Sequence, residues 1–111
     1  LTTAEIANGY KNNLDVLTDD LLYYGIDQMW QLNLDADEIF YSEIVPVLIA
    51  YFPKMDKHNG NVFGKIVNLL GQLNVQHEEL WSVIEKLFEP IKQQGLLWYG
   101  DRLHDHLILL R

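Results

Sequence analysis

The residues with the most potential for chemistry are His104, Asp105 and His106, with Asp101 one helical turn earlier. Imidazole and carboxylate groups are common zinc ligands. On a helix, however, His104 and His106 would point about 200° apart, whereas metal-ligating pairs on helices usually stand four residues apart. Asp101 and His104 would share a face, but two ligands are too few for a metal site. We therefore expect surface or partly packed polar residues here, and no metal.

Carboxylates gather in three short clusters, each at the expected start of a helix: Asp19-Asp20, Asp35 to Glu38, and Glu78-Glu79. The positive end of the helix dipole favours acidic residues in the first turn, so these clusters need no catalytic role. The sequence also contains no nucleophile elbow, phosphate-binding loop or Ser/His/Asp arrangement. We predict a protein that is not an enzyme and that uses no cofactor.

Aromatic residues are more numerous than the apolar stripes of the helices require. Trp98 and Tyr99 follow Leu97 in an expected loop, residues 93–100, and Trp81 lies beside the main stripe of its helix. Interface cores are enriched in Trp and Tyr, so we predict that these four residues contact a partner. The alternative is that the loop folds back beneath the helices as a plug.

The composition describes one acidic domain with a substantial core. The chain has 111 residues, of which 49% are hydrophobic, too many for a disordered segment. Sixteen Asp and Glu against eight Lys and Arg give a net charge of −8. Nucleic-acid binding requires a basic patch, for which this chain has few residues. The charge therefore favours a protein partner, with a basic surface, over nucleic acid.

The expected compartment follows from what the sequence lacks. No apolar run approaches the roughly 20 residues of a membrane-spanning helix. The first ten residues have neither the basic nor the apolar region of a signal peptide. Without cysteines there is no disulfide framework and no thiolate metal site. These features fit a reducing compartment, and we expect an intracellular protein.

Apolar residues recur at helical spacing along the chain, which predicts an all-α fold of about six helices. Helix starts are indicated at Thr2, Thr18, Asp35 with Glu38, Asn59 or Asn61, Glu78 with Glu79, and Asp101. The first two stripes are expected to be Ile6, Tyr10, Leu14 and Leu17, then Leu22, Ile26, Met29 and Trp30. Pro46 lies inside the third stripe, where it predicts a kink or two short helices.

The helices are expected to form antiparallel hairpins, because two stripes flank a short polar break within residues 61–91. Shifting the chain by forty residues aligns Gly60 with Gly100 and Asn61 with Asp101. Two helices per period are the unit of an α-solenoid, and an orthogonal bundle of similar helices is the alternative. The expected hairpin units of this single domain, residues 1–111, are 1–33, 35–73 and 75–111.

A family resemblance appears in the stretch that starts at Ile66. Leu69-Leu70 and Leu73, followed by Glu78-Glu79-Leu80-Trp81, resemble one unit of the octotricopeptide repeats and of the helical region of FAST-kinase-domain proteins. The stretch from Ile44 resembles the first helix of another unit. The resemblance implies helical repeats that bind RNA on a basic concave surface, and a mitochondrial location.

Two functions follow from these observations. The first is a non-catalytic interaction or scaffold domain that binds another protein, as a subunit of a larger assembly or as an acidic inhibitor-type protein. The second, implied by the resemblance, is an RNA-binding helical-repeat domain of an organellar RNA-processing or ribosomal complex. The distribution of charge on the folded surface distinguishes them, since RNA binding requires a contiguous basic groove.

Overall fold

The computed structural model describes residues 1–56 and 59–93, and every regular element in these ranges is helical. The prediction of an all-α fold is confirmed. The elements are α1 (Thr3–Asn12), the 3-10 turn η1 (Leu14–Val16), α2 (Asp19–Gln31), the π-helical segment η2 (Phe40–Ile44), α3 (Val45–Tyr51), the 3-10 turn η3 (Phe52–Lys54), α4 (Gly60–Gln72) and α5 (Glu78–Gln93). The sixth helix predicted from Asp101 lies outside the described residues.

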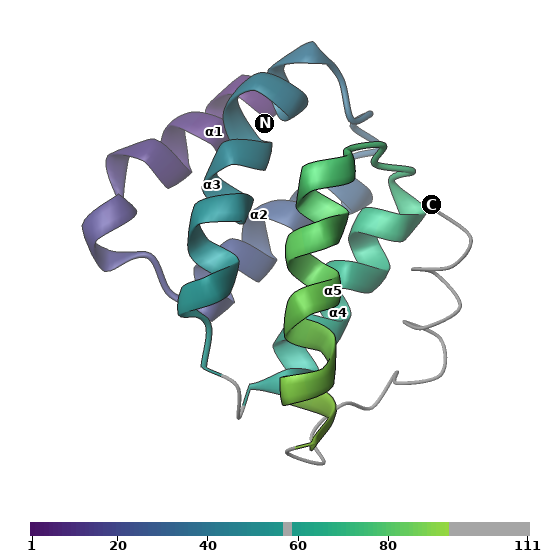
Figure 1. Cartoon of the computed structure of the whole chain (residues 1–111). Helices are drawn as coiled ribbons and strands as arrows, with labels where there is room; N and C mark the ends of the chain where they lie inside the picture. Colours follow the sequence, from purple (N-terminus) through teal and green to yellow (C-terminus); the bar gives the residue numbers. More distant parts are fainter. Residues whose placement is uncertain (57–58, 94–111) are drawn as a thin grey trace.

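The helices lie in two layers, as Figure 1 shows. α1, the continuous η2–α3 helix and α5 form one layer, and α2 and α4 lie behind them in the other. α1 packs on η2, α2 on α4 and α3 on α5, so that neighbours within a layer are second neighbours along the chain. The forty-residue repeat stays a prediction, because helices without internal repetition can pack in this way too.

The core lies between the layers and is almost entirely apolar. Its largest fully buried side chains come from η2, α3, η3 and α5 and, in the other layer, from α2 and α4. They are Phe40, Phe52, Phe63, Leu22, Ile26, Met29, Ile44, Leu48, Ile66, Leu70, Leu80 and Ile84. The stripes predicted from spacing supply most of these residues, because a helix in a small domain buries the side that carries its apolar residues.

Two residues of the predicted stripes are exposed instead. Leu14 is 57% exposed because α1 ends at Asn12, and the Asn13 side-chain amide donates to the Gly9 carbonyl across the last turn. Trp30 is 45% exposed, since it lies about 100° around α2 from the buried Met29. For these two residues the prediction of a buried position is wrong.

Side-chain caps fix where the first helices begin. Thr2, a predicted helix start, forms a capping box with Glu5: Thr2 Oγ1 accepts from the Glu5 amide, and Glu5 Oε1 accepts from the Thr2 amide. Thr18 Oγ1 accepts from the Leu21 amide at the start of α2, as predicted. At the next helix, Asp37 accepts from the Phe40 amide, so this cap is two residues later than the predicted Asp35. These caps supply acceptors for donors that the helix itself leaves unsatisfied.

Pro46 is accommodated by a change of helix type. A proline lacks an N–H and its ring collides with the carbonyl four residues earlier. In η2 the turn widens, and the Val45 N–H reaches back five residues to the Phe40 carbonyl. Pro46 then stands in the first turn of α3, where a proline is tolerated. The break predicted at Pro46 therefore takes the form of a π-helical segment before it.

Candidate protein-binding groove

An open groove of about 300 Å³ lies between α1 and α2. Leu1, Ile6 and Leu17 contribute apolar surface to it, together with Leu21 and Tyr24 of α2. Leu21 is 45% exposed and Tyr24 is 58% exposed. Concave surfaces lined mainly by apolar side chains with a few polar groups are typical of binding sites. We call this feature the α1–α2 groove.

The α1–α2 groove lies on the side of both helices that faces away from their neighbours. On α2, Tyr23 faces α4, whose Lys65 Nζ lies 5.6 Å from the centre of the Tyr23 ring. Leu21 lies about 160° around the helix from Tyr23. On α1, Lys11 faces η2 through an ion pair with Glu43, and Gly9 lies about 160° around the helix from Lys11. The groove is therefore at the free end of the two-layer stack.

Tyr10 and Gly25 form the floor of the groove. The Tyr10 hydroxyl donates a 2.6 Å hydrogen bond to the Leu22 carbonyl, and the ring lies against Gly25. A Cβ atom at residue 25 would overlap the phenol, so glycine is required for this close approach of α1 and α2. Burial of the phenol raises the pKa of Tyr10 well above its ordinary value, and the hydroxyl stays protonated. The floor is thus closely packed, and its phenol carries no charge.

Gly9 has a different role from Gly25. It lines the groove within α1, and a Cβ atom there would meet nothing within 4 Å. A glycine inside a helix costs about 1 kcal/mol relative to alanine. No close approach within the described residues requires this glycine. It leaves a length of bare backbone exposed in the wall of the groove.

Acidic groups predominate along α1, η1 and α2. These elements contain Glu5, Asp15, Asp19, Asp20 and Asp27, and one basic residue, Lys11. Lys11 Nζ lies 2.9 Å from a Glu43 carboxylate oxygen, so its charge is compensated by η2. Glu5 lines the groove itself, and Asp20 is exposed next to Leu21. Glu5 thus places negative charge in the wall of the groove, which favours a cationic surface.

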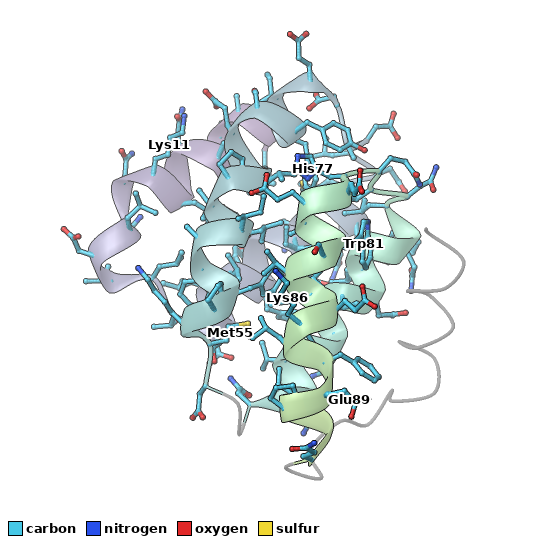
Figure 2. The ribbon with its side chains drawn as sticks, in the orientation of Figure 1. Lys11, Met55, His77, Trp81, Lys86 and Glu89 are labelled. Carbon is cyan, nitrogen blue, oxygen red and sulfur yellow. The ribbon has the colours of Figure 1, made fainter. Side chains whose placement is uncertain are left out.

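Of the four residues that the sequence indicated as partner contacts, the structure describes Trp81, which does not line this groove. Trp81 projects from α5 (Figure 2), is 5% exposed and donates its indole N–H to the Val75 carbonyl at 2.9 Å. This placement gives Trp81 a packing role in the fold. Leu97, Trp98 and Tyr99 lie outside the described residues, as do Asp101, His104, Asp105 and His106, so their roles stay predictions.

Metal ligands and membrane spans are also absent from the part of the chain that the structure describes. Among residues 1–56 and 59–93, no group of three or more His, Asp or Glu side chains could hold a metal ion. In the same ranges, none of the helices combines the length and apolarity that crossing a bilayer requires. Within these ranges the α1–α2 groove is a concave apolar surface that a partner can contact.

The apolar stripes of the sequence indicate buried surfaces, and they do not indicate the groove. Leu21, Tyr24 and Gln28 recur at helical spacing, but they lie beside the stronger stripe that begins with Leu22. This second, weaker stripe and the glycine inside α1 were the available signals. Comparisons of the chain with protein-family models, curated proteins and solved structures found no match, which leaves the groove's own geometry as the guide to function.

Proposed function

We propose that this protein is a non-catalytic helical domain that binds another protein through the α1–α2 groove. The observation that supports this function is the combination of a concave surface with exposed Leu21 and Tyr24. Tyrosine and apolar side chains at the centre of an interface contribute most of its binding energy when a partner covers them. The proposal extends the prediction of an interaction domain to a surface that the spacing of residues did not indicate.

Among the described residues, the positions of the lysines favour protein over RNA as the partner. The four lysines whose side chains are described come from four elements: Lys11 in α1, Lys54 in η3, Lys65 in α4 and Lys86 in α5. Lys11 pairs with Glu43 and Lys65 lies over the Tyr23 ring. Figure 2 shows Lys11 and Lys86 on separate helices. RNA binding would instead require basic groups aligned along a common surface.

An affinity capture with matched variants tests the proposed function. The bait proteins are the wild-type chain, Leu21→Ser and Leu32→Ser. Leu32 is 44% exposed, nearly the same as Leu21, but it does not line the groove. We expect a defined set of proteins that Leu32→Ser retains and Leu21→Ser loses. Each bait is first checked for wild-type helicity and melting temperature.

Two outcomes would contradict the proposed function. Partners that bind Leu21→Ser as well as the wild-type chain would place the interface elsewhere in the protein. Partners that disappear after nuclease treatment would favour the RNA-binding alternative. Capture is carried out at low and moderate salt, because charge-assisted association weakens as ionic strength rises.

A further inference from the structure

The contacts that α1 and α2 make within the molecule indicate which kind of element could pack on the sides that form the groove. Each of these helices packs a helix of the same layer on one side: η2 on α1, and α4 on α2. Their other sides together form the α1–α2 groove. Stacks of helical hairpins need a polar outer face at each end to remain soluble. Here the end face is concave and exposes Leu21 and Tyr24, which suits continued packing of a helix.

Gly9 adds a reason for close packing. Within the described residues its lack of a side chain serves no contact, and it weakens α1 relative to alanine. Small residues at a helix surface allow another backbone to approach closely. A helix that crosses the groove at Gly9 could pack more deeply than it could over a longer side chain. The glycine is explained if the partner element is itself a helix.

The negative charge at the groove favours an incoming helix that carries basic residues. Glu5 in the groove and Asp20 beside it favour Lys or Arg on the flanks of the incoming helix. The molecule already contains such a contact, because Lys65 of α4 lies over Tyr23 on the covered side of α2. Tyr24 offers an exposed ring on the groove side. A second copy of this face, or an anionic membrane, would be repelled by the same carboxylates.

We propose that the α1–α2 groove binds an amphipathic α-helix of a partner protein, with apolar residues against Leu21 and Tyr24, close backbone contact at Gly9, and basic residues near Glu5 and Asp20. This inference rests on the proposed function and specifies the partner's chemistry. The mode is that of a helix bound in a groove, in which residues at positions i, i+3, i+4 and i+7 provide the anchors.

A model peptide tests the inference directly. The probe is a peptide of about 14 residues, roughly 21 Å long as a helix, with Leu at i, i+3, i+4 and i+7 and Lys on both flanks. Control peptides have either the same composition in scrambled order or Glu in place of Lys. Binding is measured by titration of the ¹⁵N-labelled full chain and is mapped from amide shift changes. We expect saturable binding, with shifts concentrated on α1 and α2.

The variant Gly9→Leu is designed to fill part of the groove and so to prevent peptide binding. A Cβ atom at residue 9 meets nothing within 4 Å, and the side chain beyond it would occupy space in the groove. We expect at least a tenfold loss of peptide affinity in Gly9→Leu and less than a twofold change in Asn8→Leu, an exposed position of α1 that does not line the groove. Both variants replace a poorer helix former by leucine, so neither should lose helicity.

Three results would overturn the inference: no saturable binding of the Leu/Lys peptide, shift changes that lie away from α1 and α2, or equal affinity for the Leu/Lys and Leu/Glu peptides. If the wild-type chain self-associates and Gly9→Leu abolishes this association, the groove binds a second copy of the chain and not a partner helix. If binding of a captured partner depends on Leu21 but not on Gly9, the proposed function stands and the inference of a bound helix is wrong. The absence of any Leu21-dependent partner would reject the proposed function itself.

Discussion

The phenol of Tyr10 lies against the backbone of Gly25, with its hydroxyl bound to the Leu22 carbonyl at 2.6 Å. This contact brings α1 and α2 together and forms the floor of the α1–α2 groove. The contact joins residues of two helices, and each residue limits the size of side chain that fits at the other position. A larger residue at position 25 has no room, and a shorter one at position 10 leaves a gap.

Gly25→Ala should therefore destabilise the protein strongly. The added methyl group overlaps the Tyr10 ring, and relief requires movement of a buried side chain that holds a hydrogen bond. We expect a loss of about 1–3 kcal/mol in the free energy of unfolding, measured by urea denaturation. A second change, Tyr10→Leu, should recover part of the loss by removing the phenol that the methyl group overlaps. No loss in Gly25→Ala would contradict the close packing of α1 on α2.

Gly9→Ala should act in the opposite direction. The methyl group enters open space, and alanine is the better helix former. We expect stabilisation of about 0.5–1 kcal/mol, seen as a higher urea midpoint with an unchanged slope. Gly25→Ala provides the contrast, because the same chemical change occurs there in a filled space. Destabilisation by Gly9→Ala would show that the wall of the groove is closed at this position.

Asp19 holds three elements together, and its contribution can be isolated. Its carboxylate accepts from the Tyr51 hydroxyl at 2.5 Å and from the Asn59 side-chain amide at 2.8 Å. A double-mutant cycle with Asp19→Ala and Tyr51→Phe should give a coupling energy of about 1–2 kcal/mol. The matched cycle uses Asp20→Ala, the next carboxylate along α2, and should give less than about 0.5 kcal/mol. Equal couplings in the two cycles would indicate general charge effects in place of a hydrogen bond.

Alkaline pH should destabilise the fold through the two bonded tyrosines. Burial raises the pKa of Tyr10; burial and then the hydrogen bond to Asp19 raise the pKa of Tyr51. In the unfolded chain both phenols lose their protons near pH 10, whereas the folded protein keeps them. The stabilisation is fully present below about pH 10 and decreases as pH rises above it.

The check is the urea midpoint between about pH 9 and pH 11, on either side of the ordinary tyrosine pKa. The wild-type midpoint should fall across this range. The double variant Tyr10→Phe/Tyr51→Phe should show a smaller fall, although it starts from a lower value. Parallel curves for the two proteins would mean that other groups, such as lysines, dominate the alkaline loss.

Trp81→Phe distinguishes packing from recognition. The change removes the indole N–H that donates to the Val75 carbonyl, and it reduces the volume of a buried side chain. We expect a loss of about 1–3 kcal/mol in stability. The affinity for a captured partner should stay within twofold when measured well below the melting temperature. Normal stability with weakened binding would instead support the predicted partner contact at Trp81.

The sequence predicts the helices well because their information is local. Ile6 and Tyr10, or Leu22 and Ile26, lie one turn apart and show which side of a helix is buried. Thr2 and Thr18 are caps that act within three residues. The end of α1 was less predictable, because the Asn13 amide stops the helix before Leu14 although the apolar spacing continues.

The groove could not be predicted in the same way, since it depends on which sides of two helices remain uncovered. The spacing of Leu21 and Tyr24 is compatible with a second buried side, and only the positions of α4 and η2 decide that it is exposed. Gly9 and Gly25 both lie inside helices, and the sequence alone does not distinguish their roles. Their different roles appear only when Tyr10 is placed over one of them.

The pairing of second neighbours within each layer also has a consequence for folding. The contacts of α1 with η2, of α2 with α4 and of α3 with α5 each close a chain loop of similar length. Loop-closure entropy grows slowly with length, so none of the three closures is favoured by its length alone. The order of assembly should then follow the strength of each contact. The α2–α4 pair, which makes the most extensive of the three contacts, is positioned to form first, and the groove is complete only when α1 has docked on α2.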